Sequence, residues 1–134
     1  MAGTGSRDEV RRLLDELLEA QNSGDAPRLR TMLSERPGAV HIGTDAGEWW
    51  TAGQLVDGVA AAADGGQDVR VVADEVDVHV QGDIAWVEGR ARIIRADGAE
   101  RPVRTTGVLV REGGGWKLVQ SHASIAVPNT DIFG

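Results

Sequence analysis

Cysteine and tyrosine are both absent from this chain of 134 residues, and phenylalanine occurs only once. Without cysteine the chain cannot form a disulfide bond, bind zinc through thiolates or use a thiol nucleophile. Without tyrosine it has no phenol to act as an acid or to donate a hydrogen bond to an oxyanion. Four tryptophans therefore supply most of the aromatic surface, and two of them, Trp49 and Trp50, are adjacent.

The chain also lacks an excess of positive charge. It has 14 Lys and Arg against 21 Asp and Glu, a formal net charge of −7, and its basic residues form no cluster. This balance argues against nucleic acid and anionic membrane surfaces as partners. Apolar runs are shorter than a membrane span, and the first twenty residues are charged rather than signal-like. We therefore expect a cytoplasmic protein that uses no membrane.

Helix signals occupy the first half of the chain. Ser6-Arg7-Asp8-Glu9 has the pattern of a capping box ahead of an apolar stripe between Val10 and Leu18. Gly24 can end this helix, and Asp25 can cap a second, shorter one. Thr51-Ala52-Gly53-Gln54 repeats the capping-box pattern and predicts a third helix.

The second half alternates as strands do. The valines between Val69 and Val80 change parity, which predicts a bulge near Asp74-Glu75. Three turns separate four strands, at 81–83, at Asp97-Gly98 and at 113–115. We predict an α+β fold in which three N-terminal helices pack on a curved, mainly antiparallel sheet. We expect a disordered leader at 1–6, a single domain at 7–126 and a C-terminal tail at 127–134.

The last strand carries a face that changes from apolar to polar. Strand alternation puts Trp116, Leu118, Gln120, His122 and Ser124 on one side. Such a face suits the wall of a pocket. His122 is the first candidate for proton transfer, because an imidazole changes charge near neutral pH. The alternative is a half-buried strand histidine that a neighbouring polar group satisfies.

Pairing with the neighbouring strands brings more polar groups to this face. A tight turn at 113–115 sets Thr106 opposite His122. The strand before contributes three residues to the same face, Trp86, Glu88 and Arg90. If the turn at Asp97-Gly98 has a loop of three residues, Arg90 joins the row of Thr106 and His122. If the loop has two residues, Thr105 takes that place.

Two carboxylates precede the third helix. Glu48, beside Trp49 and Trp50, would be partly desolvated, which suits an acid or a base. The alternative is that Glu48 is a solvated loop residue. The same two interpretations, an acid or base and a solvated loop residue, apply to Asp45. We predict a catalytic set of His122, Glu48 and Asp45, and a substrate-binding set of Trp49, Trp86, Glu88, Arg90, Thr106, Gln120 and His41. The three histidines are too dispersed for metal ligation, so we expect no metal and no cofactor.

Three stretches resemble the SnoaL-like branch of the nuclear transport factor 2-like superfamily. They are Asn22-Ser23-Gly24-Asp25, Glu48-Trp49-Trp50-Thr51-Ala52-Gly53 and the strand from Trp116 to Ser124. The resemblance implies a cone-shaped fold that encloses a pocket between helices and sheet. It also implies activities such as polyketide cyclisation, steroid isomerisation, dehydration and epoxide hydrolysis. The tyrosines of the isomerases and dehydratases are missing here, and the Asp/Arg/Asp set of the epoxide hydrolases is unmatched.

Two functional hypotheses follow. The first is an enzyme that performs cofactor-independent proton transfer on an apolar, oxygenated substrate, by cyclisation, isomerisation, dehydration or hydrolysis. His122 would move the proton, Asp45 or Glu48 would be its carboxylate partner, and Arg90 and Thr106 would stabilise an oxyanion. The second is a non-catalytic module of the same fold for ligand binding or assembly.

Either hypothesis is compatible with a homodimer. Val119 and Ile125 lie on the face of the last strand opposite His122. An apolar outer face of a curved sheet is normally covered by another surface, and a second copy of the chain is the commonest cover. We therefore expect a small-molecule ligand and a homodimer as the partners of this chain.

Overall fold

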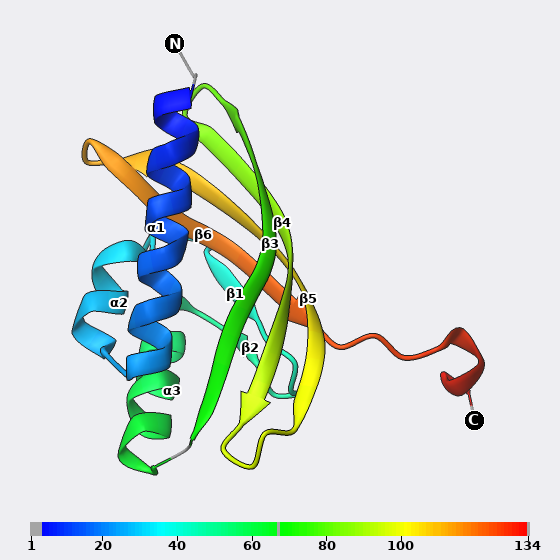
Figure 1. Cartoon of the computed structure of the whole chain (residues 1–134). Helices are drawn as coiled ribbons and strands as arrows, with labels where there is room; N and C mark the ends of the chain where they lie inside the picture. Colours follow the sequence, from blue (N-terminus) through cyan, green and yellow to red (C-terminus); the bar gives the residue numbers. More distant parts are fainter. Residues whose placement is uncertain (1–3, 67, 134) are drawn as a thin grey trace.

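The structure, a computed structural model, describes residues 4–66 and 68–133. Three helices and six strands make up the domain (Figure 1). The helices are α1 (Thr4–Ser23), α2 (Ala26–Met32) and α3 (Ala52–Asp64). The strands are β1 (Val40–Ile42), β2 (Trp49–Trp50), β3 (Val69–Gln81), β4 (Ile84–Arg95), β5 (Glu100–Glu112) and β6 (Gly115–Ser124). After β6 the chain extends away from the sheet and reaches a short 3-10 turn, η1 (Asn129–Asp131).

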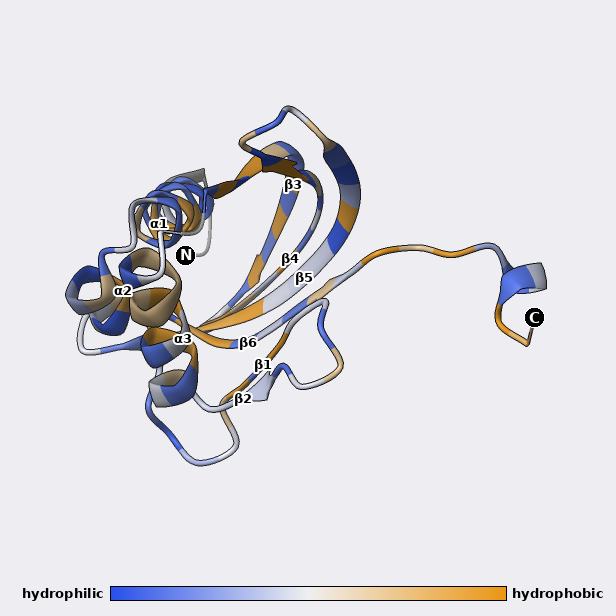
Figure 2. Cartoon of the chain, turned by 90° about the horizontal axis from the view of Figure 1, so that it is seen from below, coloured by the Kyte–Doolittle hydropathy of each residue, from blue (hydrophilic) through white to orange (hydrophobic). Residues whose placement is uncertain are grey.

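One curved sheet contains all six strands, in the order β2-β1-β6-β5-β4-β3. Neighbouring strands are antiparallel except β1 and β6, which are parallel. The helices gather against one face of this sheet, called the inner face below, and the opposite face is called the outer face (Figure 2). The predicted α+β architecture is confirmed.

The predicted helix caps are confirmed, with one correction. The Asp25 side chain accepts a hydrogen bond from the backbone N–H of Arg28, and Thr51 and Gln54 form a complete capping box. α1 begins at Thr4, however, so Ser6 lies inside the helix rather than capping it. Its hydroxyl accepts a hydrogen bond from Arg111 of β5 at 3.3 Å, a tertiary contact that no local pattern reveals. Residues 1–3 of the expected leader lie outside the described residues.

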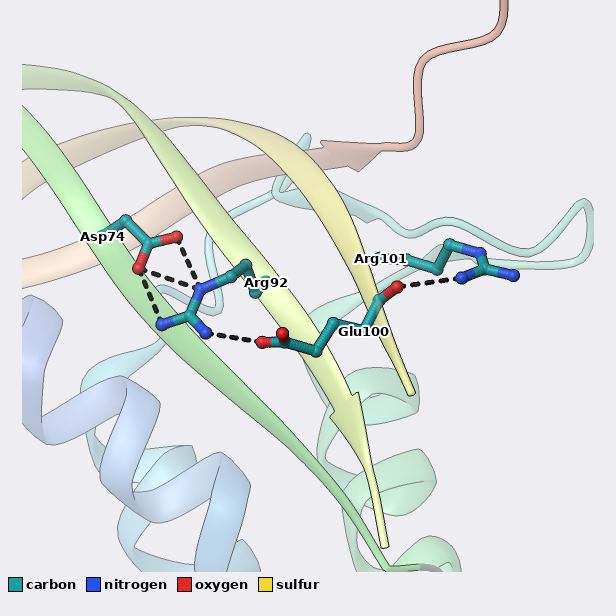
Figure 3. Close-up of polar contacts among 4 residues, drawn as sticks. All are labelled: Asp74, Arg92, Glu100 and Arg101. Atoms are coloured by element: carbon teal, nitrogen blue, oxygen red, sulfur yellow. Dashed lines mark hydrogen bonds and ion pairs between the residues drawn. The ribbon is translucent and has the colours of Figure 1, made fainter. Parts of the chain in front are cut away.

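The predicted bulge in β3 is confirmed, and a set of ion pairs spans it. The pairing of β3 with β4 shifts between Ala73 and Glu75, which leaves Asp74 as the extra residue. Both carboxylate oxygens of Asp74 accept hydrogen bonds from Arg92, which also donates to Glu100 (Figure 3). The Arg92 hydrogen bonds lower the pKa of Asp74. The bulged residue is thus tied to β4 and, through Arg92, to β5.

A second bulge, which the sequence analysis missed, lies in β6. Leu118 pairs with Leu109 and Gln120 pairs with Val108, so Val119 is an extra residue. An extra residue reverses the faces of everything after it. Leu118 before the bulge therefore faces the helices, and so does Ser121 after it.

The core lies between the helices and the inner face. Buried side chains from all three helices meet buried side chains from β3 to β6, including Val10, Leu17, Leu29, Leu33, Val56, Val59, Val78, Ala85, Leu109, Trp116 and Leu118. Trp116 belongs to this core: it is 6 % exposed, and the Arg111 guanidinium lies 4.5 Å from the ring centroid. Burial of this apolar area is the main favourable term in folding.

Gly24 joins α1 to α2 at a point where α3 comes very close. Its φ of +71° is in the left-handed region, and a Cβ at this position would overlap the Cβ of Ala63 in α3. Glycine is therefore required for two reasons, backbone conformation and space.

We expect Gly24→Ala to lower the free energy of unfolding more than Gly38→Ala does. Gly38 also has a positive φ, +90°, but a Cβ there would meet nothing within 4 Å. The Gly38 variant should lose about 1–2 kcal/mol from backbone strain alone. The Gly24 variant should lose about 1–3 kcal/mol more, because its methyl group is forced against α3. Urea unfolding of both variants measures the difference, and equal losses would contradict the close contact.

Candidate functional site

A cavity of about 310 Å³ lies between the helices and the inner face of the sheet. Its wall is mainly aliphatic and takes leucines from the three helices and β6: Leu14, Leu17, Leu18, Leu29, Leu55 and Leu118. The strands add a smaller number of polar residues, and these decide what the cavity can do chemically. A largely apolar pocket with few polar groups is the usual form of a small-molecule site.

His41 and Ser121 form the polar centre of this wall. The parallel pairing of β1 with β6 sets these two residues side by side, and Nδ1 of His41 lies 2.8 Å from Oγ of Ser121. His41 is only 3 % exposed, and its Nε2 has no hydrogen-bond partner within the described part of the chain. A buried polar atom without a partner is costly, so Nε2 is a point where a bound molecule would gain a hydrogen bond.

Burial determines the charge of His41. Desolvation of the ring lowers the pKa of His41 below its ordinary value, so the imidazole is neutral at neutral pH. If the Ser121 hydroxyl donates to Nδ1, then Nε2 carries the proton and is a donor. If Nδ1–H donates to the hydroxyl, then Nε2 is a free base. Either tautomer presents one unused polar atom.

The two predicted carboxylates occupy different places. Glu48 is half-buried and borders the cavity, and its Oε1 accepts a hydrogen bond from the backbone N–H of Asp45 at 2.8 Å. Asp45 is exposed, and its own carboxylate accepts from the backbone N–H of Gly47 at 2.9 Å. Asp45 thus closes the loop, whereas Glu48 is available to the cavity.

The structure places three predicted pocket residues on the outer face instead. Trp86, Glu88 and Arg90 are exposed, because they alternate with the inward residues of β4. Glu88 contacts His79 at 2.8 Å, whose ring stacks on Trp86, and Arg90 lies 3.6 Å from Glu75. The expectation that these residues share the cavity with His122 is therefore wrong.

His122, Thr106 and Gln120 also have exposed side chains. The predicted pairing of Thr106 with His122 is correct, and both positions border the cavity. Their side chains nevertheless lie on the outer face. Thr106 alternates with the inward Thr105 of β5, and the bulge at Val119 turns Ser121 of β6 inward and its two neighbours, Gln120 and His122, outward. The expected inward direction of the His122 ring is wrong for this reason.

Both predicted alternatives for the β4–β5 register are wrong as well. Arg90 pairs with Arg104, two residues from the first expected partner, Thr106, and one residue from the second, Thr105. Thr105, opposite Gly89, is the threonine on the inner face: a Cβ on Gly89 would lie 3.1 Å from its Oγ1 and near the core residue Val76.

The tryptophan pair divides between the two faces. Trp49, predicted to bind substrate, is 71 % exposed on the edge strand β2. Trp50, which was not predicted, borders the cavity and packs against Gly58 of α3. Residues two apart share a face of an extended segment. The prediction that Glu48 lies in a pocket wall therefore also implied that Trp50 lies there. Ser121 had no comparable signal.

None of the described helices has the length and apolar character needed to cross a membrane. Across residues 4–66 and 68–133, no group of three His, Asp or Glu side chains is arranged to hold a metal ion.

A curved sheet that encloses a cavity beneath three helices is the architecture of NTF2-like proteins. An NTF2-like protein of unknown function from Pseudomonas putida KT2440 is similar over 95% of this chain and 91% of its own, with 19% identity and a TM-score of 0.80. A protein from Streptomyces avermitilis, described as a dehydratase candidate of the NTF2-like family, has 20% identity over 94% of this chain and 100% of its own, with a TM-score of 0.75.

A superfamily member from Salmonella enterica has 16% identity over 98% of both chains, with a TM-score of 0.78. These similarities show the fold alone. The model of the SnoaL-like domain matches residues 10–128, so the chain belongs to this family. No curated protein matches the chain.

The lowered pKa of His41 predicts a pH dependence of stability. The unfolded chain protonates this histidine at the ordinary value of about 6.5, whereas the folded chain resists protonation. Stability from this difference is complete above that value and is lost as the pH falls through and below it. Urea unfolding at about pH 7.5 and about pH 5.5 should show a fall in the wild type that His41→Gln reduces.

The matched control is His122→Gln, because that side chain is exposed. It should retain the wild-type fall in stability. Equal falls in the wild type and His41→Gln would mean that His41 titrates alike in the folded and unfolded states.

Proposed function

We propose that this protein is a cofactor-independent enzyme that transfers protons to and from a small, apolar, oxygenated molecule in the cavity. The reaction class is cyclisation, isomerisation, dehydration or hydrolysis. One observation carries the proposal: a neutral, buried imidazole in an aliphatic wall, held through Nδ1 and unpartnered at Nε2. An imidazole in this state can accept a proton at neutral pH.

The neighbouring residues take supporting roles in this proposal. Ser121 positions the His41 ring through its hydrogen bond to Nδ1. Glu48, half-buried at the cavity wall, is the carboxylate that stabilises positive charge on the ring or the substrate. Thr105, on the inner face of β5, offers a hydroxyl for an oxygen of the substrate. These roles replace those that the sequence analysis gave to His122, Asp45, Arg90 and Thr106.

The comparison with the Streptomyces avermitilis protein is compatible with this chemistry. A dehydratase removes a proton and assists the departure of a hydroxyl group, which requires general acid and base groups but no redox cofactor. That description belongs to a protein of 20% identity. The present proposal therefore rests on His41 and its surroundings and not on the name of a relative.

A generic proton-abstraction probe tests the proposal without knowledge of the natural substrate. In 5-nitrobenzisoxazole a base removes the proton on C3, the electron pair forms a nitrile, and the N–O bond breaks to release a coloured phenolate. We expect the wild type to accelerate this elimination above buffer, and His41→Ala to lower kcat/KM by about 100-fold. His122→Ala should have the wild-type rate.

Binding must be measured beside turnover, because the two functional hypotheses differ there. Isothermal titration with benzisoxazole, which lacks the activating nitro group, reports occupancy of the cavity. Binding without any His41-dependent acceleration of the probe would contradict the enzyme and support a non-catalytic ligand-binding module. Loss of the activity in His122→Ala would instead contradict the assignment of the base.

We also propose that two copies of the chain associate through the outer face of the sheet. Ile84 and Trp86 are 44 % and 41 % exposed on neighbouring outward positions of β4. Val119 and Ile125, which the sequence placed on this face, do not contribute to it: Val119 is the bulge residue, and Ile125 lies beyond the end of β6. A second copy that covers this apolar surface would remove it from water.

Sedimentation velocity at about 10 µM, within the range where specific dimers associate, measures the mass of the species. We expect a dimer of the 14.2 kDa chain, and a monomer for Trp86→Glu. The same substitution in the exposed Trp49 of the edge strand is the control and should keep the dimer. A monomeric wild type would contradict the proposal.

A further inference from the structure

A second hollow, of about 620 Å³, adjoins the cavity and is called the vestibule below. The vestibule is bordered by the C-terminal ends of α1 and α3 and by the beginning of β3. Cavity and vestibule share part of their walls, including Glu48, Trp50 and Leu55. These shared residues therefore stand at the boundary between the two hollows.

Positive side chains are missing from both hollows. None of the described residues that border them is a lysine or an arginine. The titratable residues around the cavity are Glu48, His41 and His122, and Glu48 alone among these also borders the vestibule. His41 is neutral because burial lowers its pKa, and the His122 side chain lies on the outer face. The fixed charge at the boundary is thus negative.

Two helix ends add to this negative potential. The last turns of α1 and α3 contribute Asn22, Ser23, Ala62 and Ala63 to the vestibule wall. The carboxyl end of a helix carries a partial negative charge, and neither helix has a basic residue in its last turn. The close contact of Gly24 with Ala63 holds both ends at the same hollow.

Two glycines leave the space that Glu48 and Trp50 occupy. A Cβ on Gly43 would lie 2.7 Å from Oε2 of Glu48, and a Cβ on Gly58 would lie 2.7 Å from the Trp50 ring. Oε1 of Glu48 accepts the Asp45 N–H. No lysine, arginine or histidine of the described chain lies within ion-pair distance of the Glu48 carboxylate.

A carboxylate without a cationic partner and a tryptophan at one boundary suit an organic cation. The carboxylate attracts an ammonium group by charge and accepts its N–H, while an indole ring attracts cations through its π face. We propose that the ligand of the cavity is an apolar molecule that carries an ammonium group, and that Glu48 and Trp50 hold this cation at the boundary with the vestibule. This inference rests on the proposed ligand-binding function and specifies the charge of the ligand.

Three probes with one apolar body and different head groups test the inference. They are 1-adamantylammonium, 1-adamantanol and adamantane-1-carboxylate. Isothermal titration at neutral pH and low salt should give the tightest binding for the ammonium, about tenfold tighter than the alcohol, and the weakest for the carboxylate.

Glu48→Gln should remove the advantage of the ammonium over the alcohol. Its side-chain carbonyl can still accept the hydrogen bond from Asp45. The matched control is Glu88→Gln, an exposed carboxylate on the outer face, which should keep the wild-type order of affinities. If Glu48→Gln does not fold, the wild type still decides: raising salt should weaken binding of the ammonium and leave the alcohol unaffected.

The outcomes separate this inference from the proposed function. Suppose that the alcohol binds and His41-dependent elimination is present, but the ammonium does not bind more tightly. The inference about the cation is then wrong, and the proposed enzymatic function is still supported. If the ammonium advantage survives in Glu48→Gln, the assignment of the cation site is wrong. If none of the three probes binds, the ligand-binding function fails together with the inference.

Discussion

The hydrogen bond between His41 and Ser121 depends on the parallel pairing of β1 with β6. β1 is three residues long and reaches the sheet between β2 and β6, so its position is fixed from both sides. The parallel register sets His41 next to Ser121, and the bulge at Val119 turns Ser121 toward the helices. Without both features the imidazole would be buried with neither nitrogen satisfied. The chemistry of the cavity therefore depends on one short strand and one extra residue.

The two faces of the sheet divide the charges of the protein. The outer face carries arginines and carboxylates in pairs, such as Arg92 with Asp74 and Arg90 with Glu75, and these groups stay in contact with water. Such exposed pairs contribute little to stability but keep a broad sheet face soluble. Among the described residues, arginine and lysine are absent from the cavity wall and Glu48 is its one carboxylate, so this group has a large influence there.

Most of the fold could be predicted because local signals were sufficient. A few consecutive residues indicate each of three confirmed features: the cap at Asp25, the capping box at Thr51–Gln54 and the bulge near Asp74. The site was harder to predict, because the sheet face on which a side chain lies depends on pairing between strands that are distant in the sequence. Nothing around Val119 marks a bulge, since its effect arises from the register against β5. Because this extra residue was not foreseen, the side chain of His122 was expected to point inward, and Ser121 was not recognised as a residue of the cavity wall.

The bulge in β6 also separates two kinds of change at one position. In-frame loss of the codon for Val119 would remove the residue that has no partner on β5, so Gln120 and His122 would still point outward and Ser121 inward. Closing the bulge at constant length would instead slide the end of the strand by one residue. Gln120 and His122 would then point inward and Ser121 outward, so that a carboxamide and a second imidazole would replace the hydroxyl. The extra residue, rather than the identity of one side chain, thus decides which polar groups of this strand line the cavity.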